Sequence, residues 1–371
     1  MKLTVCQIIP TLVQGGAEKQ MSLLAMHLDR QLFDCHVVAL SHSGPWESPL
    51  RQTGVPVHVV GKNWKADPRA WLRLTNKLRA IKPQIVQTWL FAANSYGRLA
   101  AAQSSVPVII ASERCVDPWK SGWQGWIDRW MLRYTRCITT NSSAVADFYA
   151  QRGVPRDLFQ VIPNAVTPAL GSLPRAELFR RLNLPQRKYV VAAVGRLWPQ
   201  KGYTDLLWAA ELLRVALREV WVIILGDGPQ RDYLQRLRDD YGCQDAVRFV
   251  GHRPDARELL SSADLVWNGS LYEGQSNSIM EAMAAGVPVL ATDIPGNRDL
   301  VVHQQTGYLY PVGNVNQLIR WSSELLQNPQ LRSSMGRQSV QRVEQHFSLG
   351  RMVSAYSELY HRLATEGNVL S

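Results

Sequence analysis

Short apolar runs and amphipathic segments alternate along the whole chain. Six runs of strand length occur in the first half: LTVCQIIP, CHVVALS, VPVHVV, QIVQTWL, VPVIIAS and CITTNS. Six more occur in the second half: YVVAAVG, EVWVIILGDG, AVRFVG, ADLVWNGS, PVLATD and TGYLYPV. The segments between these runs repeat their apolar residues with the period of a helix. This alternation of strand and helix predicts an α/β protein with parallel sheets.

The chain is expected to form two domains. Its 371 residues exceed the size at which a single hydrophobic core keeps growing. Between the two sets of strands, the segment 161–175 contains three prolines and a glycine, a composition typical of a hinge. We therefore predict two doubly wound, Rossmann-like domains, over residues 1–165 and 166–349. A last helix within 350–371 is assigned to the first domain, because it can cross back to it.

Composition argues against several classes of protein. No apolar run approaches the roughly 20 residues of a membrane-spanning helix. The N-terminal stretch MKLTVCQIIP is expected to be a first strand and not a secretion signal. The five cysteines are scattered and lack a C-x-x-C pair, so neither a disulfide framework nor a zinc site is predicted. A cytoplasmic location is therefore expected.

The net charge of +11 is concentrated in the first half. Residues 1–165 hold 19 Lys and Arg against 10 Asp and Glu, whereas residues 166–371 hold 22 against 20. An anionic partner is therefore expected on the first domain. A nucleic acid is not expected, since no recognisable nucleic-acid-binding motif accompanies the charge.

The most informative segment is NGSLYEGQSNSIMEAMAAGVPVLATDIPGN (268–297). It is predicted to run from a buried strand through a loop into a helix that Ser276 caps and Gly286 ends. Ligands of open α/β sheets bind at such strand ends, against helix N-termini. Glu273 in the loop and Glu281 inside the helix would then accept hydrogen bonds from the hydroxyls of a ribose and a hexose. The alternative is that both are helix-start acids favoured by the helix dipole.

Two further turns follow predicted strands. In GRLWPQKG, Arg196 and Lys201 lie where both can point at one anion and stabilise the charge of a departing diphosphate. The alternative is that each is a solvated surface charge. In QGGAEKQ, Gly15 and Gly16 leave a phosphate-sized opening at the start of a helix. This turn is not G-x-G-x-x-G, so a nicotinamide or flavin site is not expected.

Together these segments resemble the retaining GT-B glycosyltransferases of family four, over nearly the whole chain. The matching stretches are QGGAEKQ, VIPNAV, VGRLWPQKG, LGDGP and EGQSNSIMEAMAAGVPVLATDIPGN, whose E-x7-E pair is the most specific. The resemblance implies two Rossmann-like domains facing across a cleft, with a nucleotide-sugar donor bound mainly by the second domain and an acceptor by the first. It also implies transfer with retention of configuration, without a metal or another cofactor.

The resemblance also implies roles for individual residues. Glu281 would hold the ribose, and Glu273 would hold the donor sugar together with the backbone amides of residues 274–277. Arg196 and Lys201 would neutralise the diphosphate, so the expected catalytic residues are Arg196, Lys201 and Glu273. The expected donor-binding residues are Gly15, Gly16, Gly226, Gly228, Gly274, Gln275, Ser276, Asn277, Ser278 and Glu281.

The acceptor side departs from the family pattern. Many relatives carry a histidine or aspartate near the reacting sugar, but the corresponding stretches here are QTWLFAAN and ASERCVD. The expected acceptor-side residues are Trp89, Asn94, Glu113 and Arg114. A donor phosphate oxygen that takes the acceptor proton would make a side-chain base unnecessary. Glu113 either orients the acceptor hydroxyl or forms a buried ion pair with Arg114 or another cation.

A row of tryptophans follows on the same side. Trp119, Trp123, Trp126 and Trp130 are spaced by four, three and four residues, as on one face of a helix. Such a face is usually part of a protein core. However, two glycines within the segment weaken the helix, which allows a loop with exposed indoles instead.

The preceding amphipathic segment, 67–83, carries three cations beside its apolar face. Interfacial indoles and basic side chains are the ingredients of reversible attachment to an anionic membrane. The expected membrane contacts are Arg69, Arg73, Lys77, Trp119, Trp123 and Trp126. We therefore expect the protein to be peripheral on the inner face of the plasma membrane. The alternative is an ordinary solvated surface.

The sequence is thus expected to encode an enzyme that transfers a sugar from a UDP-hexose or UDP-N-acetylhexosamine to a glycan acceptor. The acceptor is expected to be linked to a polyprenyl diphosphate, in the synthesis of a surface polysaccharide or lipopolysaccharide. Two alternatives stay open, namely an epimerase or phosphorylase of the same fold and a non-catalytic nucleotide-sugar sensor. An epimerase would bring acid and base groups into the cleft, whereas only His252 and His303 lie near strand or helix ends of the second domain.

Overall fold

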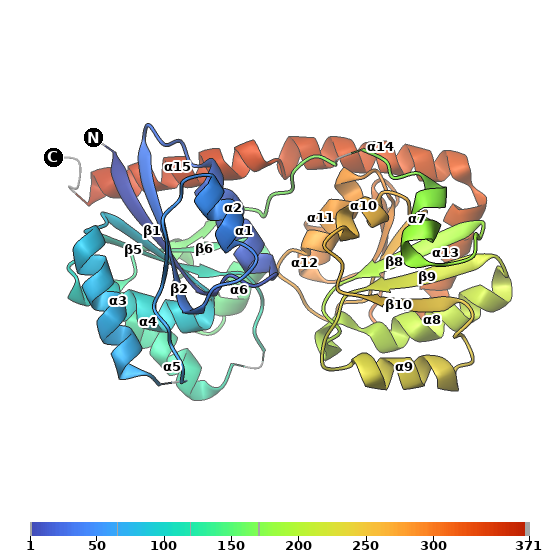
Figure 1. The fold of residues 1–371 in the computed structure, drawn as a ribbon, viewed down its shortest axis with the longest axis horizontal. Coiled ribbons are helices and arrows are strands. Elements are labelled where there is room, and N and C mark those ends of the chain that lie inside the picture. The colour runs from blue at the N-terminus through green and yellow to red at the C-terminus, as the bar shows by residue number, and fades with distance from the viewer. Residues whose placement is uncertain (1, 65, 119, 170, 368–371) are drawn as a thin grey trace. The chain divides into compact units, whose positions relative to one another are not determined.

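The computed structural model describes residues 2–64, 66–118, 120–169 and 171–367, and it divides into two compact units (Figure 1). Unit 1 comprises Met1–Asn164 and Leu349–Ser371, and unit 2 comprises Ala165–Ser348. The first boundary falls inside the proline-rich segment that was expected to be a hinge.

Unit 1 is built on a seven-stranded sheet in which neighbouring strands are parallel. Its strand order is β3-β2-β1-β4-β5-β6-β7. The strands are β1 (Leu3–Thr11), β2 (Phe33–His42), β3 (Val57–Val59), β4 (Ile85–Trp89), β5 (Val108–Glu113), β6 (Cys137–Thr140) and β7 (Phe159–Val161). The edge strand β7 was not predicted, because its three residues are too few for a periodic pattern to be recognised.

Apart from the last one, which ends the element order, the helices of unit 1 connect successive strands, as parallel pairing requires. They are α1 (Gly16–His27), α2 (Glu47–Gln52), α3 (Pro68–Ile81), α4 (Leu90–Gln103), α5 (Gly122–Met131), α6 (Ser143–Ala150) and α15 (Leu349–Glu366). Local chemistry sets their starts, and α3 is the clearest case. The Asp67 carboxylate accepts hydrogen bonds from the amides of Arg69 and Ala70, both at 3.1 Å, and Pro68 occupies the first helical position.

Helix α15 belongs to unit 1 although it is the last element of the chain (Figure 1). Its buried Tyr360 hydroxyl accepts a hydrogen bond from Gln7 on β1 at 2.9 Å and donates one to Gln87 on β4. The hydroxyl of Tyr356 accepts a 3.3 Å hydrogen bond from Arg114, just beyond β5. These bonds tie the helix to three strands, as buried polar groups require.

Unit 2 has a six-stranded parallel sheet in the order β10-β9-β8-β11-β12-β13. Its strands are β8 (Tyr189–Val194), β9 (Val220–Leu225), β10 (Val247–Gly251), β11 (Leu265–Asn268), β12 (Val289–Thr292) and β13 (Gly307–Tyr310). Its helices are α7 (Arg175–Leu182), α8 (Tyr203–Ala216), α9 (Arg231–Asp240), α10 (Ala256–Leu260), α11 (Asn277–Ala284), α12 (Pro295–Arg298), α13 (Val315–Gln327) and α14 (Pro329–His346). Two hydrophobic clusters share the strand residues of this sheet and cover both its faces.

Both sheets reverse their strand order once, which is the mark of a doubly wound fold. The reversal lies between β1 and β4 in unit 1 and between β8 and β11 in unit 2. This confirms the predicted α/β class with two Rossmann-like domains. Ligands of such sheets bind beyond the carboxyl ends of the strands at the reversal. Across the described part of the chain, no helix has the length and apolarity needed to cross a bilayer.

Candidate functional site

The strand-order reversal of unit 2 brings two loops into contact, one after β8 and one after β11. Gly202 has φ +62°, and a Cβ there would lie 2.1 Å from the Gly269 carbonyl oxygen, so only glycine allows this approach. The loops also exchange hydrogen bonds. The Leu271 amide donates to the Gln200 carbonyl at 2.8 Å, and the Gln200 side chain donates to the Tyr272 carbonyl at 2.7 Å.

This contact places Lys201 beside Glu273. The two side chains form an ion pair, in which the Glu273 side chain is 9% exposed and that of Lys201 is 21% exposed. Ser270 donates a further hydrogen bond to Glu273 Oε1 at 2.8 Å. The structure therefore brings together a cation and a carboxylate that the sequence analysis assigned to the same ligand, although they lie on different loops.

Arg196 has a different partner. Its guanidinium carbon lies 4.7 Å from the ring centroid of Trp198 on the same loop, and both side chains are exposed. The two cations that were expected to converge on one anion are thus engaged separately, Lys201 by a carboxylate and Arg196 by an indole. A diphosphate bound here would have to draw both away from these partners.

Helix α11 begins where it was predicted but is not capped as predicted. Ser276 occupies the N-cap position, yet its hydroxyl accepts no backbone hydrogen bond from the helix. Instead, Ser276 Oγ lies 3.0 Å from Ser278 Oγ and accepts a 3.3 Å hydrogen bond from Asn268. Gly286 follows the helix with φ +70°, two residues beyond its end at Ala284. Glu281 lies one turn inside the helix and is half-buried.

A buried pair of asparagines supports this loop, and the sequence analysis gave neither a role. Asn297 donates hydrogen bonds to the Thr292 carbonyl at 2.9 Å and to Asn268 Oδ1 at 3.3 Å. Asn268 Oδ1 also accepts from the Ser270 amide at 3.2 Å. The sequence did offer a signal for Asn297, namely the PGN turn that follows a predicted strand. In the structure this turn starts α12.

Close backbone packing explains two of the expected donor-binding glycines, Gly226 and Gly228, and also Gly296, which was not among them. A Cβ at Gly226, where φ is +148°, would lie 1.9 Å from the Gly195 carbonyl oxygen, and one at Gly228 would lie 2.5 Å from that of Leu197. The Gly274 carbonyl oxygen is approached closely by Gly296, whose Cβ would lie 2.1 Å away. These glycines therefore hold the loops of the site together, whether or not they also touch a ligand.

In unit 1, α1 starts at Gly16 with Gly15 at its N-cap position. A Cβ at Gly15 would lie 2.1 Å from Glu18 Oε2, so this carboxylate folds over the start of the helix. Glu18 is buried, and this burial raises its pKa. The place where a phosphate was expected thus carries a carboxylate of the chain itself.

The structure corrects the expectation that Trp89, Asn94 and Arg114 face an acceptor. Trp89 is fully buried and donates a 2.7 Å hydrogen bond to Gln7. Arg114 is buried over the Trp89 ring, 5.1 Å from its centroid, and bonds to Tyr356. Asn94 is fully buried and donates to Glu113 Oε1 at 3.0 Å. All three side chains are buried and have partners inside unit 1.

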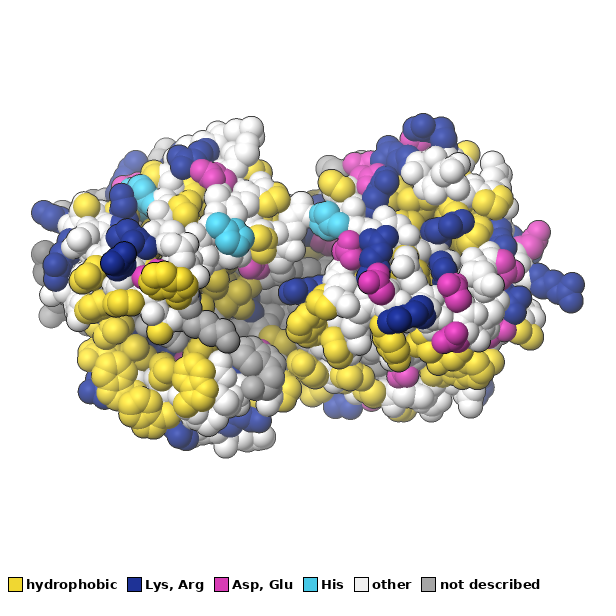
Figure 2. All heavy atoms as spheres, turned by 60° about the horizontal axis from the view of Figure 1, so that its bottom comes forward, with side chains coloured by type: hydrophobic (Ala, Val, Ile, Leu, Met, Phe, Trp, Pro, Cys, Tyr) yellow, Lys and Arg dark blue, Asp and Glu magenta, His cyan; other side chains and the backbone are white. Residues whose placement is uncertain are grey.

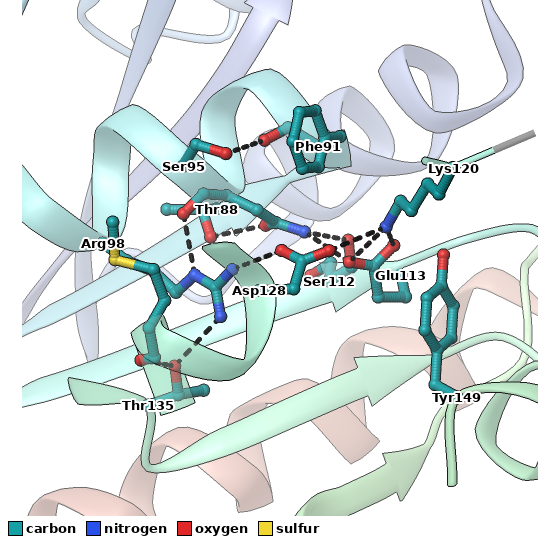
Figure 3. Close-up of polar contacts among 12 residues, drawn as sticks. Thr88, Phe91, Ser95, Arg98, Ser112, Glu113, Lys120, Asp128, Thr135 and Tyr149 are labelled. Carbon is teal, nitrogen blue, oxygen red and sulfur yellow. Dashed lines mark hydrogen bonds and ion pairs between the residues drawn. The ribbon is translucent and has the colours of Figure 1, made fainter. Parts of the chain in front are cut away.

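Glu113 pairs with Lys120, not with Arg114. The Lys120 ammonium lies 3.2 Å from Glu113, 3.1 Å from Asp128 and 3.7 Å from Asp117. Arg98 approaches Asp128 from the opposite side, at 2.7 Å (Figure 3). Burial disfavours the ammonium, but the three carboxylates outweigh that effect and raise the pKa of Lys120. Of the two alternatives for Glu113, the structure shows the buried ion pair with another cation.

The tryptophan segment forms a helix, but its indoles are not core. In α5, Trp123 is 62% exposed and Trp126 is 60% exposed, whereas Trp130 is half-buried. The prediction that the indoles are core is therefore wrong for Trp123 and Trp126. The alternative of a loop is wrong as well, because the segment is helical. Trp119 lies outside the described residues. Figure 2 shows hydrophobic side chains gathered on one face of unit 1, at the left, with Lys and Arg side chains nearby.

The three cations of α3 that were expected to contact a membrane differ in their surroundings. Arg73 donates hydrogen bonds to the carbonyls of Val60 at 2.8 Å and Gly61 at 2.7 Å. Arg69 is exposed and Lys77 is half-buried. Arg73 is nevertheless exposed, and the expected contact of Arg69, Arg73 and Lys77 with a membrane stays a prediction.

Neither a cluster of metal-binding side chains nor a disulfide occurs among the residues that the structure describes. Within 2–64, 66–118, 120–169 and 171–367, no group of three or more His, Cys, Asp or Glu side chains is arranged to hold a metal ion. None of the five cysteines, all of which the structure describes, forms a disulfide.

Comparisons with known proteins converge on one activity class. The family described as "Glycosyltransferase Family 4" matches residues 14–170, and that described as "Glycosyl transferases group 1" matches residues 174–342. The lipopolysaccharide core biosynthesis glycosyltransferase LpsE of Rhizobium meliloti is 28% identical over 62% of this chain, a match that spans 65% of LpsE, less than two thirds. The UDP-Gal:alpha-D-GlcNAc-diphosphoundecaprenol alpha-1,3-galactosyltransferase of Escherichia coli is 24% identical over 97% of this chain and 96% of its own length.

Among solved structures, Anabaena HepE in complex with UDP and glucose has a TM-score of 0.86. The two chains are 21% identical, and the match covers 97% of this chain and 100% of HepE. At this identity, the likeness establishes a shared fold.

Proposed function

The chain belongs to the GT-B glycosyltransferases of group 1 and family 4, and from this membership we propose that it transfers a sugar from a nucleoside-diphosphate donor to a glycan acceptor. The observation that carries the proposal is the Lys201–Glu273 ion pair at the strand-order reversal of unit 2. A partly buried cation–carboxylate pair at the ligand-binding edge of a sheet offers a cation for the diphosphate and an acceptor for sugar hydroxyls.

The donor in this proposal is a UDP-hexose or UDP-N-acetylhexosamine. The E. coli relative is named for a UDP-galactose donor, and HepE has been crystallised with UDP-glucose. The acceptor is a glycan, in the synthesis of a lipopolysaccharide or surface polysaccharide, as the name of LpsE suggests. A polyprenyl-diphosphate link in the acceptor is supported by the name of the E. coli relative, which specifies a diphosphoundecaprenol.

The residues act on the donor in a definite order. The diphosphate competes with Glu273 for Lys201 and draws Arg196 from the Trp198 ring. As the bond from the anomeric carbon to the diphosphate oxygen breaks, negative charge grows on the leaving group, and the two cations stabilise it more than the ground state. Glu273, released from Lys201, accepts hydrogen bonds from hydroxyls of the donor sugar.

Retention of configuration and independence of metal are part of the proposal. In this scheme, the leaving phosphate oxygen takes the proton of the acceptor hydroxyl on the same face of the sugar. A side-chain base is then unnecessary, which fits the enclosed positions of Glu113 and Asn94. Glu281, on the half-buried side of α11, holds the ribose hydroxyls.

We further propose that unit 1 binds the anionic inner face of the plasma membrane. The support is the pair of exposed indoles on α5, together with Leu72 and Trp64, which are 53% and 63% exposed beside the cations of α3. Exposed aromatic side chains next to basic ones favour the interface of an anionic bilayer. A lipid-linked acceptor is presented at such a surface.

The test is calorimetric titration of the protein with UDP, GDP, ADP and their sugar conjugates, first without metal and then with magnesium. We expect binding of UDP and one UDP-sugar without metal. Incubation with that donor in radiolabelled form and lipid-linked glycans should then give labelled glycan. No response to any nucleotide would contradict the proposal, and binding without sugar transfer would indicate a sensor.

A further inference from the structure

A cavity of about 260 Å³ lies in unit 1 between α5, α6 and the loop before α5. Its walls include Asp117, Lys120, Asp128, Arg129, Tyr149 and Arg152. This volume is just below the roughly 300 Å³ at which pockets for drug-sized ligands begin, so it suits a single sugar ring or a group of similar size. The proposed donor site in unit 2 contributes no residue to it.

The α5 wall of the cavity carries two glycines, at positions 122 and 125. A Cβ added at either position would meet no atom within 4 Å, so packing does not require glycine there. Neither has a positive φ that would require it. Each glycine lowers the stability of the helix relative to alanine. Because Gly122 and Gly125 have no side chains, the α5 wall leaves the cavity open.

The carboxylates of the cavity already have cationic or hydroxyl partners. Asp117 accepts a 2.9 Å hydrogen bond from Tyr149 and faces Lys120, while Asp128 is shared by Lys120 and Arg98 (Figure 3). Lys120 in turn is neutralised by these carboxylates and Glu113. This inner group holds three carboxylates against two cations, Lys120 and Arg98, and burial raises the pKa of Glu113. An excess of positive charge in the cavity therefore has to come from its remaining walls.

Those remaining walls carry two arginines. Arg152 lies over the Phe148 ring, with its guanidinium carbon 3.5 Å from the centroid, and donates a 3.1 Å hydrogen bond to the Phe148 carbonyl. Within the described residues, neither Arg129 nor Arg152 is paired with a carboxylate. Stacking on an aromatic ring holds a guanidinium in place, so less entropy is lost when it binds an anion.

We propose that this cavity binds a sugar residue of the acceptor that carries an anionic group, a phosphate or a carboxylate. The two arginines bind the anionic group, and the polar wall formed by Asp117, Lys120 and Tyr149 meets the sugar hydroxyls. This inference rests on the proposed function, since it gives the acceptor of the transfer reaction a binding site on unit 1. The excess of cations over anions in residues 1–165 also favours the approach of an anionic ligand to unit 1.

The central variant is Gly125→Leu, which adds a side chain to the α5 wall of the cavity at a position where a Cβ meets no atom within 4 Å, and which improves the helix propensity there. Its matched control is Gly350→Leu in α15, where an added Cβ also meets nothing within 4 Å. Arg129→Gln and Arg152→Gln remove the two charges singly. All variants are titrated by calorimetry with glucose 1-phosphate, glucuronic acid, glucose and inorganic phosphate, in the presence of saturating UDP.

We expect glucose 1-phosphate or glucuronic acid to bind to the wild type and to Gly350→Leu, and more tightly than glucose. Which of these anions binds distinguishes a phosphate-bearing from a carboxylate-bearing sugar. Gly125→Leu should abolish this binding, and each arginine variant should weaken it about 10- to 100-fold, as expected for a lost charged hydrogen bond. Equal binding to Gly125→Leu, or inorganic phosphate bound as tightly as the sugar anion, would overturn the proposal, as would the absence of binding.

The same titrations separate this inference from the proposed function. UDP itself is titrated into each variant, and its affinity should be the same in all of them. UDP binding without any sugar-anion binding would overturn the cavity assignment alone. If UDP does not bind, the donor assignment fails, while the comparison of wild type with Gly125→Leu still tests the cavity.

Discussion

At the scale of single residues, the Lys201–Glu273 pair is the feature on which the proposed donor site depends most. Both positions could be proposed from sequence, because each follows a strand in a segment whose motif is specific. Their mutual pairing could not, because it results from the contact of two loops 72 residues apart. The pair implies that an arriving diphosphate exchanges one anionic partner of Lys201 for another.

Lys201→Ala should lower kcat by roughly 10²- to 10³-fold, by analogy with the loss of other electrostatic stabilisers of a transition state. Glu281→Ala should instead raise the donor dissociation constant by about 10-fold or more, because it removes a charged hydrogen bond to the ribose. The measurements are steady-state kinetics and donor titration. Lys188→Ala, an exposed lysine of the same unit, is the control. Wild-type behaviour of both site variants would remove the site assignment.

The buried Lys120 makes a second prediction at this scale. Lys120→Met leaves Glu113, Asp117 and Asp128 without their shared cation, which should lower the free energy of unfolding by about 3–5 kcal/mol at neutral pH. The deficit should shrink in acid, where the unpaired carboxylates take up protons. Denaturant unfolding of this variant against Lys188→Met measures it. An unchanged unfolding midpoint would contradict the role given to the cluster.

The raised pKa of Lys120 also sets the sign of a pH effect in the wild type. A cation whose pKa is higher in the folded than in the unfolded state stabilises the fold fully below its ordinary value of 10.5. That contribution is lost as the pH rises through the raised value. Unfolding experiments above pH 10.5 should therefore show a loss of stability that Lys120→Met lacks.

At the scale of elements, the pattern of the chain predicted the strands well and the orientation of their side chains less well. All twelve expected strands are present, whereas β7 was too short to be recognised. Trp89 shows the limit. It ends a strand that is buried on both faces, so periodicity gives no indication of which neighbour it meets. Its partner Gln7 is 82 residues away, and only the tertiary structure joins them.

Helix α5 shows the opposite kind of error, since an apolar periodicity was present but the apolar side chains are exposed. The Ser121 amide donates a 2.8 Å hydrogen bond to the Gln124 side chain, which supports the start of the helix despite its two glycines. The ion pairs of Asp128 attach the opposite side of the helix to the unit. Because these ion pairs hold the polar side of the helix against the unit, Trp123 and Trp126 face outward. The apolar pattern of the sequence alone does not show which side faces the unit.

If α5 binds a membrane, the double variant Trp123→Ser/Trp126→Ser should lose most of its affinity for vesicles. We expect the wild type to co-sediment with vesicles containing phosphatidylglycerol more than with pure phosphatidylcholine, because the surface is basic as well as aromatic. The control is Trp208→Ser in unit 2, which replaces an indole that is 43% exposed. Equal co-sedimentation of both variants would contradict the membrane proposal.

Helix α15 supplies a further prediction. Tyr360→Phe removes the hydroxyl that joins Gln7 and Gln87, leaving two buried amides without that partner. The free energy of unfolding should fall by about 1–3 kcal/mol, measured by urea denaturation. Tyr233→Phe changes an exposed tyrosine of unit 2 and should have no effect. If Tyr360→Phe were as stable as that control, the buried network would not be what holds α15.

At the scale of the whole molecule, the alternation of strand and helix was sufficient to predict two doubly wound sheets. Parallel pairing forces long crossovers, and right-handed crossovers leave few arrangements for such a sequence. The hinge was visible from its prolines. The network that fixes α15 to unit 1 was not, since its Gln, Tyr and Arg members are separated by up to 353 residues.

The chain passes from one unit to the other twice, near residue 164 and again near residue 348. Unit 2 is thus one continuous stretch, while unit 1 needs the last segment of the chain for completion. A ribosome makes proteins from the N-terminus, so β1 and β4 emerge long before α15 can cover them. Unit 2 can fold once its own stretch has emerged, whereas the Gln7 and Gln87 side chains lack their hydrogen-bond partner Tyr360 until α15 has emerged. The newborn protein should therefore depend most on chaperones in its first half, although that half is made first.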